Sequence, residues 1–168
     1  FGSGLEQFGT SPFDGCTSLE KITVDAGNSV FESADGILFD KGKTELITCP
    51  IGFTGDADGA YSIPDTVLKL SNYAFRYSNI KSIVIPGSVT EVGNQAFRYS
   101  EALEDVEFTG TGNIDFGTYV FANCTALESF TLGAGITDVG AYMFNDCSSL
   151  KQVTFGDDTE NFGAMAFR

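Results

Sequence analysis

The feature that most constrains the fold of this chain is a sequence repeat of about 23 residues. Phe recurs at positions 75, 97, 121, 144 and 167, at intervals of 22, 24, 23 and 23 residues. The aligned copies share the pattern h-G-x-x-A-F-x-x-[C/S]-x-x-L-x-x-h-x-h, in which h is an apolar residue, and residues 8–24 fit it as well. One such unit cannot bury its own apolar side chains, so the repeats are expected to stack into a solenoid.

The pattern also predicts the local structure of each unit. The ending L-x-x-h-x-h alternates with period two, as in Ser129-Phe130-Thr131-Leu132, which indicates a short strand with one buried face. The recurrent Gly suggests a backbone angle that a Cβ atom would forbid. The stretch around Asn94-Gln95-Ala96-Phe97 is too short for a full helix, so we expect one helical or 3₁₀ turn. The small Cys/Ser column fits an interior corner of the stack.

The repeat is interrupted between Val24 and Ile63. Two apolar stretches around Asp35-Gly36 predict a β-hairpin, and residues 44–49 predict a further strand. We expect this variant, hairpin-containing coil at 25–62 to continue the stack. Residues 1–168 would then form a single repeat domain, with regular repeats at 8–24 and 63–168. Because the chain begins and ends inside a repeat, we expect it to be part of a longer array.

The repeat resembles the BspA-like leucine-rich repeats of bacterial cell-surface proteins. The matching motifs are Val92-Gly93-x-x-Ala96-Phe97-x-x-Ser100-x-x-Leu103-x-x-Val106 and Val139-Gly140-x-x-Met143-Phe144-x-x-Cys147-x-x-Leu150-x-x-Val153. The resemblance implies a leucine-rich-repeat solenoid, mainly β. It would be a right-handed superhelix with a parallel sheet on its concave face and short strands, turns or 3₁₀ segments elsewhere. It also implies an extracellular or cell-surface location, a role in adhesion or protein binding, and no catalytic residues.

Charge and composition exclude several classes of function. The chain has 9 Lys and Arg against 23 Asp and Glu, a net charge of −14, which disfavours nucleic acid and anionic lipid as partners. No apolar run approaches the length of a membrane span, so no membrane insertion is expected. There is no His, which excludes His-based triads and His-containing metal sites. The resemblance instead implies a protein ligand, such as a host or microbial surface protein.

No cofactor or metal site is predicted. The acidic turns at 56–59 and 157–160 lack the third acidic position and the distal Glu of an EF-hand loop. The four cysteines form no C-x-x-C pair, which disfavours zinc. Cys124 and Cys147 share a column on adjacent coils, within disulfide range, but their side chains would point in parallel, so we expect free buried thiols.

Two surfaces are candidates for an interaction site. The first is the outward face of the repeat strands, which is small and polar and has no aromatic platform. Its residues are Thr23, Ser82, Val84, Asp105, Glu107, Ser129, Thr131, Gln152 and Thr154. The alternative is a patch of Arg and Tyr side chains that stacking would align, at Arg76, Tyr77, Arg98 and Tyr99. Arg and Tyr are favoured in interaction hot spots. The competing interpretation is that internal carboxylates already pair with both Arg side chains, and we expect this internal pairing.

Three functions are compatible with these features. The first is a non-enzymatic extracellular binding module, engaged in adhesion or protein–protein interaction at a bacterial surface. The second is a structural spacer that projects another domain from the surface. The third is a carboxylate-only hydrolase using Asp105 and Glu107, which needs a deep, dry pocket that repeat arrays seldom form. An exposed patch complementary to a partner would favour the binding module. Exposed repeat columns without such a patch would favour the structural spacer.

Overall fold

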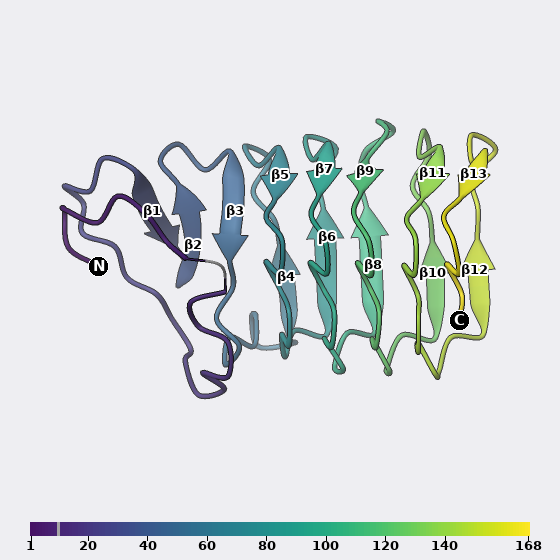
Figure 1. Ribbon diagram of the computed structural model, residues 1–168, viewed down its shortest axis with the longest axis horizontal. Helices are drawn as coiled ribbons and strands as arrows, with labels where there is room; N and C mark the ends of the chain where they lie inside the picture. The colour runs from purple at the N-terminus through teal and green to yellow at the C-terminus, as the bar shows by residue number, and fades with distance from the viewer. Residues whose placement is uncertain (10) are drawn as a thin grey trace.

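The computed structural model describes residues 1–9 and 11–168, and shows a stack of β-coils arranged along one axis (Figure 1). Within these residues there are thirteen strands and no helix. The strands are β1 (Phe31–Ala34), β2 (Ile37–Asp40), β3 (Glu45–Thr48), β4 (Ala60–Ser62), β5 (Lys69–Leu70), β6 (Ser82–Ile85), β7 (Glu91–Val92), β8 (Asp105–Phe108), β9 (Asp115–Phe116), β10 (Ser129–Thr131), β11 (Asp138–Val139), β12 (Gln152–Thr154) and β13 (Asn161–Phe162). The β-solenoid expected from the repeat is confirmed.

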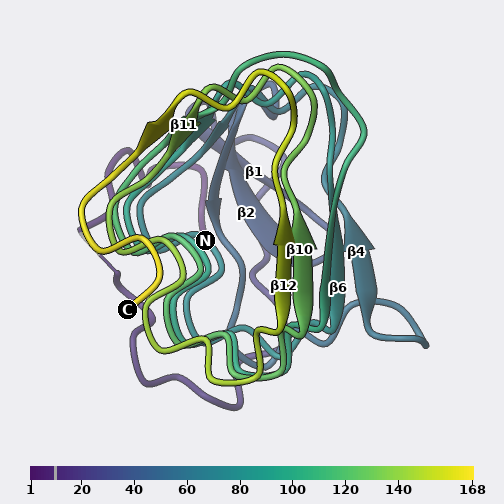
Figure 2. The ribbon, with the colours of Figure 1, turned by 90° about the vertical axis from the view of Figure 1, so that its right-hand side faces the viewer.

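Each regular coil contributes one strand to each of two sides of the solenoid. On the first side β4, β6 and β8 pair in parallel, as do β10 and β12. On the second side the two-residue strands β5, β7 and β9 pair in parallel, as do β11 and β13. The view along the axis shows the two sides and the turns between them (Figure 2). Both sides are interrupted between the same two coils, since the described strands include no β8–β10 or β9–β11 pair.

A ladder of phenylalanine rings runs through the core. Phe75, Phe97, Phe121 and Phe144 are 0%, 0%, 0% and 2% exposed. Successive rings stack with centroids 5.0, 5.0 and 6.0 Å apart. The predicted burial of this column is therefore confirmed.

The segment that carries each Phe is a corner built from overlapping turns. We call residues 71–78, 93–100, 117–124 and 140–147 corners. In the first, Ala74 N–H donates to Ser71 O, and Arg76 N–H and Ser78 N–H donate to Tyr73 O and Phe75 O. Tyr73 and Tyr77 have φ of 65° and 62°, the left-handed region that the third residue of a type II turn requires. The prediction of a helical or 3₁₀ turn here is wrong, because residues with positive φ at these two positions cannot continue a right-handed helix.

Adjacent corners are joined by backbone hydrogen bonds. Every second N–H points along the solenoid axis: Tyr73 N–H donates to Asn94 O at 3.1 Å and Phe75 N–H to Ala96 O at 2.7 Å. The same bonds join the corners on either side of the interruption, where Phe121 N–H donates to Met143 O at 2.9 Å. The backbone hydrogen bonds between corners thus continue at the position where both sheets are interrupted.

The glycine column serves close approach between coils. Gly93, Gly117, Gly140 and Gly163 do not have the positive φ that we predicted for them, so that prediction is wrong. A Cβ atom on Gly93 would lie 2.6 Å from Asn72 N, and one on Gly117 2.6 Å from Asn94 N. Because the neighbouring atoms are backbone of the preceding coil, a side chain here would push two coils apart.

The Cys/Ser column supplies hydrogen-bond donors to the preceding coil. Ser100 Oγ donates to Phe75 O at 2.8 Å, Cys124 Sγ to Phe97 O at 3.3 Å, and Cys147 Sγ to Phe121 O at 3.1 Å. These side chains are buried, so the donors satisfy carbonyls that water does not reach. The residues of this column are small, as expected. Ser100, Cys124 and Cys147 are also polar, because each donates a hydrogen bond to a carbonyl of the preceding coil.

The variant coil holds an antiparallel hairpin at the N-terminal end of the stack. β1 and β2 pair around Asp35 and Gly36, whose φ values of 53° and 87° fit a two-residue hairpin turn. β3 pairs with β2 on one side and with β5 on the other. The buried Asn28 ties the chain start to this hairpin, since its Nδ2 donates to Gly2 O and Leu5 O and its Oδ1 accepts from Val30 and Phe31.

Candidate interaction surfaces

The outward strand face brings together eight of the nine residues predicted for it. Asp105, Glu107, Ser129, Thr131, Gln152 and Thr154 are exposed on β8, β10 and β12. Ser82 and Val84 are half-buried on β6, next to Asp105 and Glu107 in the paired register. Thr23 lies outside the strands of this face. Its place is taken by β4, where Ser62 pairs with Val84, a position that the column alignment missed because it falls in the variant coil.

The carboxylates of this face lie in an open hollow. Asp105 and Glu107 line a shallow depression of about 270 Å³ with Ser129 and Thr131, where β8 and β10 are adjacent but unpaired. This open surface differs from the deep, enclosed pockets in which small-molecule substrates are usually bound. The arrangement suits contact with another surface better than hydrolysis.

The Arg/Tyr patch forms a ladder along the corners, as its register predicted. The rings of Tyr77 and Tyr99 stack with centroids 5.1 Å apart. The Arg76 guanidinium lies 4.7 Å from the Tyr77 ring and the Arg98 guanidinium 4.7 Å from the Tyr99 ring. Arg98 also lies 5.1 Å from the ring of Tyr119, so each guanidinium contacts more than one tyrosine ring.

The two arginines differ in their polar partners. Arg76 pairs with Asp14 at 3.3 Å, so internal carboxylate pairing is confirmed for this residue. It is wrong for Arg98, which donates to Gln95 Oε1 at 3.0 Å and to Tyr99 Oη at 3.1 Å instead. Gln95 lies three residues before Arg98 in the same corner. The column alignment did not indicate that its side chain contacts the Arg98 guanidinium.

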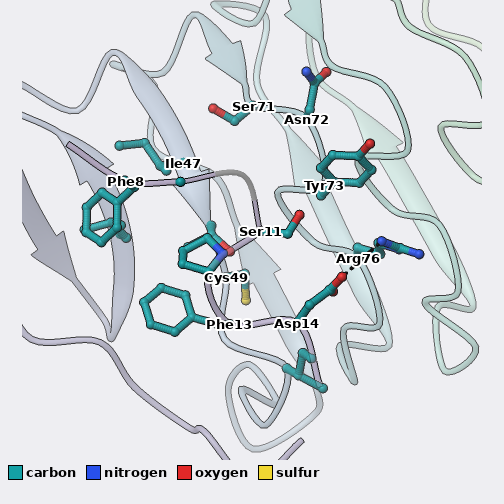
Figure 3. Close-up of a pocket in the computed structure, with 15 residues that line it drawn as sticks. Phe8, Ser11, Phe13, Asp14, Ile47, Cys49, Ser71, Asn72, Tyr73 and Arg76 are labelled. Carbon is teal, nitrogen blue, oxygen red and sulfur yellow. Dashed lines mark hydrogen bonds and ion pairs between the residues drawn. The ribbon is translucent and has the colours of Figure 1, made fainter. Parts of the chain in front are cut away.

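A gap between residues 8–9 and 11–17 on one side and the first corner on the other was not predicted from the sequence (Figure 3). It consists of two cavities of about 260 and 520 Å³, which share Asp14 and Ile51 in their walls. Cys49 lies between the two walls in the close-up, and the Asp14–Arg76 ion pair spans them. No sequence signal marks the gap, because it arises from the path of the variant coil between two regular ones.

Comparison with known proteins identifies the family. A sequence profile described as the BspA type leucine rich repeat region matches six copies over residues 53–168. The chain belongs to this family. A comparison with curated protein sequences gives no match.

Solved structures of bacterial proteins share the fold of this BspA-type repeat. The pneumococcal vaccine antigen PcpA is 25% identical with a TM-score of 0.76, over 90% of this chain and 38% of that one. A leucine-rich repeat protein from Eubacterium ventriosum is 26% identical with a TM-score of 0.73, over 95% and 45% of the two chains. A leucine rich cell surface protein from Faecalibacterium prausnitzii, 23% identical with a TM-score of 0.65, covers 83% and 42% and shares the fold. The chain thus spans less than half the length of each.

The acidic turns of the BspA-type array are engaged by backbone donors. Asp56 Oδ1 accepts from Asp58 N–H and Ala60 N–H, and the bond from Ala60 is the main cause that lowers the pKa of this carboxyl. Asp158 Oδ2 accepts from Gly135 N–H. Across residues 1–9 and 11–168, no group of three or more Cys, Asp or Glu side chains is arranged to hold a metal ion. In the same residues no helix has the length and apolar character needed to cross a membrane.

The thiols of the BspA-type array differ in reactivity, which a labelling experiment can measure. Burial raises the pKa of Cys147 to about 11 and that of Cys49 and Cys124 well above the usual range, whereas Cys16 is exposed. Since only the thiolate is nucleophilic, the three buried thiols stay protonated and unreactive at pH 8. We expect Ellman's reagent at pH 8 to label one thiol per native chain and four after denaturation without reductant. A denatured count of two would instead indicate a disulfide.

Proposed function

We propose that the chain is a non-enzymatic, extracellular binding module of a bacterial surface protein. The surface we assign to binding is the outward face of β6, β8, β10 and β12, with Asp105 and Glu107 at its centre. Partners of this kind include host or microbial surface proteins, and adhesion is the setting in which the face would act. We also propose that residues 1–168 act as a single repeat domain.

One observation carries this proposal. Exposed polar side chains of β8, β10 and β12 lie on one face, in paired register within β6–β8 and within β10–β12, and the hollow between β8 and β10 contains two carboxylates. Solenoids use such extended faces to contact other proteins. The likeness to bacterial surface proteins supports the location and the class of function, and the open hollow favours binding over hydrolysis.

Charge reversal on this face provides the test. We expect Asp105→Lys with Glu107→Lys to reduce binding of the labelled protein to immobilised epithelial-cell surface proteins at least tenfold, because two of the central charges change sign. The matched control is Asp65→Lys with Asp157→Lys, which makes the same change in net charge at exposed positions outside the face. Both variants are checked by circular dichroism and thermal unfolding.

Two outcomes would contradict the proposal. Equal loss of binding in both variants would attribute the effect to net charge. Unchanged binding in the face variant would favour a structural spacer that projects another domain, the second function that the repeat permits.

A further inference from the structure

The first corner of the array presents unpaired carbonyl groups to the gap. In each later corner the equivalent carbonyls accept N–H groups of the preceding corner, as Asn94 O and Arg98 O accept from Tyr73 and Tyr77. In the first corner Ala74 O accepts from Cys49 N–H, but Asn72 O and Arg76 O accept no hydrogen bond from the described residues. Among the residues that the structure describes, this wall of the gap is therefore a backbone edge with two acceptors that have no donor.

The opposite wall has the turn structure of a corner and presents donors. Asp14 N–H donates to Ser11 O and Cys16 N–H to Phe13 O, in the positions where Arg76 and Ser78 donate in the first corner. Ser11 and Gly15 have φ of 49° and 79°, matching the positive angles of Tyr73 and Tyr77. The N–H groups of Phe13 and Gly15, whose equivalents elsewhere donate to the next coil, donate to no described residue.

The space between these walls exists because the variant coil takes a shorter path. β3 leads directly to Cys49 and Ile51, which form the floor, and this coil lacks the double turn that carries Phe in its neighbours. The gap is thus the outer part of one corner position, whose centre is occupied by Cys49 through its bond to Ala74 O. It has an apolar floor, free acceptors on one side and free donors on the other.

One aromatic surface also faces this space. Tyr77 lines the larger cavity, and Tyr99 covers one face of its ring at 5.1 Å. The Arg76 guanidinium is 4.7 Å from the Tyr77 ring and 6.0 Å from the Tyr99 ring, so it lies beside the stack and leaves the other face of Tyr77 open. Tyr77 is 36% exposed. In the regular ladder that face would be covered by a residue of the preceding corner.

We propose that the gap binds an extended peptide segment of a partner protein, which occupies the outer part of this corner position. Its backbone N–H groups pair with Asn72 O and Arg76 O, its carbonyls pair with Phe13 N–H and Gly15 N–H, and an aromatic side chain stacks on Tyr77. Backbone pairing of an added segment with an open edge is a general mode of peptide recognition. Asp14 and Glu101 in the cavity wall and the net charge of −14 disfavour acidic peptides. The site is separate from the strand face and does not depend on it.

The test begins with a phage-displayed library of random heptapeptides, selected on the immobilised protein. We expect enriched peptides to contain an aromatic residue and to bind as synthetic peptides in fluorescence anisotropy. N-methylation of the peptide amides that pair with the carbonyl wall is expected to weaken binding at least tenfold. These amides alternate with others that point away, whose methylation should have little effect.

Variants of the protein locate the binding site. We expect Tyr77→Asn to weaken the selected peptides at least tenfold, because Asn tolerates the positive φ but removes the ring. Thr17→Trp should also weaken them, because it fills the larger cavity. The controls are Tyr142→Asn, also at a positive φ, and Thr109→Trp, at an exposed position that lines neither cavity.

The proposal would be overturned if no peptide is enriched, or if selected peptides bind the Tyr77 and Thr17 variants as tightly as the wild type. In the second case the peptides bind elsewhere, and the charge-reversal variants of the strand face show whether that face is the site. Circular dichroism of each variant confirms that lost binding does not reflect lost folding.

Discussion

Phe121→Ala is expected to lower the free energy of unfolding by about 3–5 kcal/mol, the range for removing a fully buried aromatic ring. The ring is 0% exposed and contacts three others, with centroids 5.0 Å from Phe97, 5.1 Å from Phe130 and 6.0 Å from Phe144. Its corner is held by a backbone bond from Phe97 N–H to Val120 O and by one from Phe121 N–H to Met143 O, so neighbouring coils cannot collapse to fill the cavity. Urea unfolding followed by circular dichroism measures the change.

Phe162→Ala is the matched control for this variant. Phe162 occupies the first apolar position of its repeat, five residues before the phenylalanine column, and is 54% exposed, so its removal leaves no cavity. We expect a loss below about 1 kcal/mol, because surface substitutions seldom cost more. A loss below 1 kcal/mol for Phe121→Ala itself would contradict a stack held together by the phenylalanine ladder.

Gly93→Ser is expected to destabilise the protein by about 1–3 kcal/mol through overpacking, and to lower the melting temperature accordingly. The added Cβ would lie 2.6 Å from Asn72 N and 2.8 Å from the carbonyl carbon of Ser71. Both atoms are backbone and cannot rotate away, so the two coils would have to separate. The separation would strain the hydrogen bonds between the corners.

Gly9→Ser tests the same column without the contact. Gly9 occupies the equivalent position in the first repeat, and a Cβ atom there would have no neighbour within 4 Å. We expect its melting temperature to stay within 1–2 °C of the wild type. Equal destabilisation of the two variants would show that glycine is needed in this column for another reason.

The repeat spacing predicted the parts of the fold that depend on periodicity. The phenylalanine ladder, the short alternating strands and the Asp35-Gly36 hairpin follow from residue type and position, since each places apolar side chains on a shared face or a turn residue between strands. These features can be predicted without knowing the distances between adjacent coils.

The features that the sequence did not predict depend on distances between coils. To predict the role of Gly93, one would need the distance from its Cα to the preceding coil. The hydrogen bonds from Cys124 and Cys147 to carbonyls depend on the same distance between coils. The pairing of Arg98 with Gln95 depended on side-chain geometry inside one corner. The gap could not be predicted because it results from a coil that omits its corner. The roles of both candidate surfaces stay predictions until binding is measured.

The alignment of hydrogen bonds in the corners gives the array an electrical polarity. In every corner the axial N–H groups point toward later coils and the axial carbonyls toward earlier ones, so these peptide dipoles of about 3.5 D add head to tail, as they do in an α-helix. The parallel strands contribute little, because the dipoles of a sheet largely cancel. The negative direction runs toward the earlier coils, and in the first corner it ends at Asn72 O and Arg76 O. The positive direction of this alignment runs toward the later coils, through the N–H groups of Tyr142, Phe144 and Asp146.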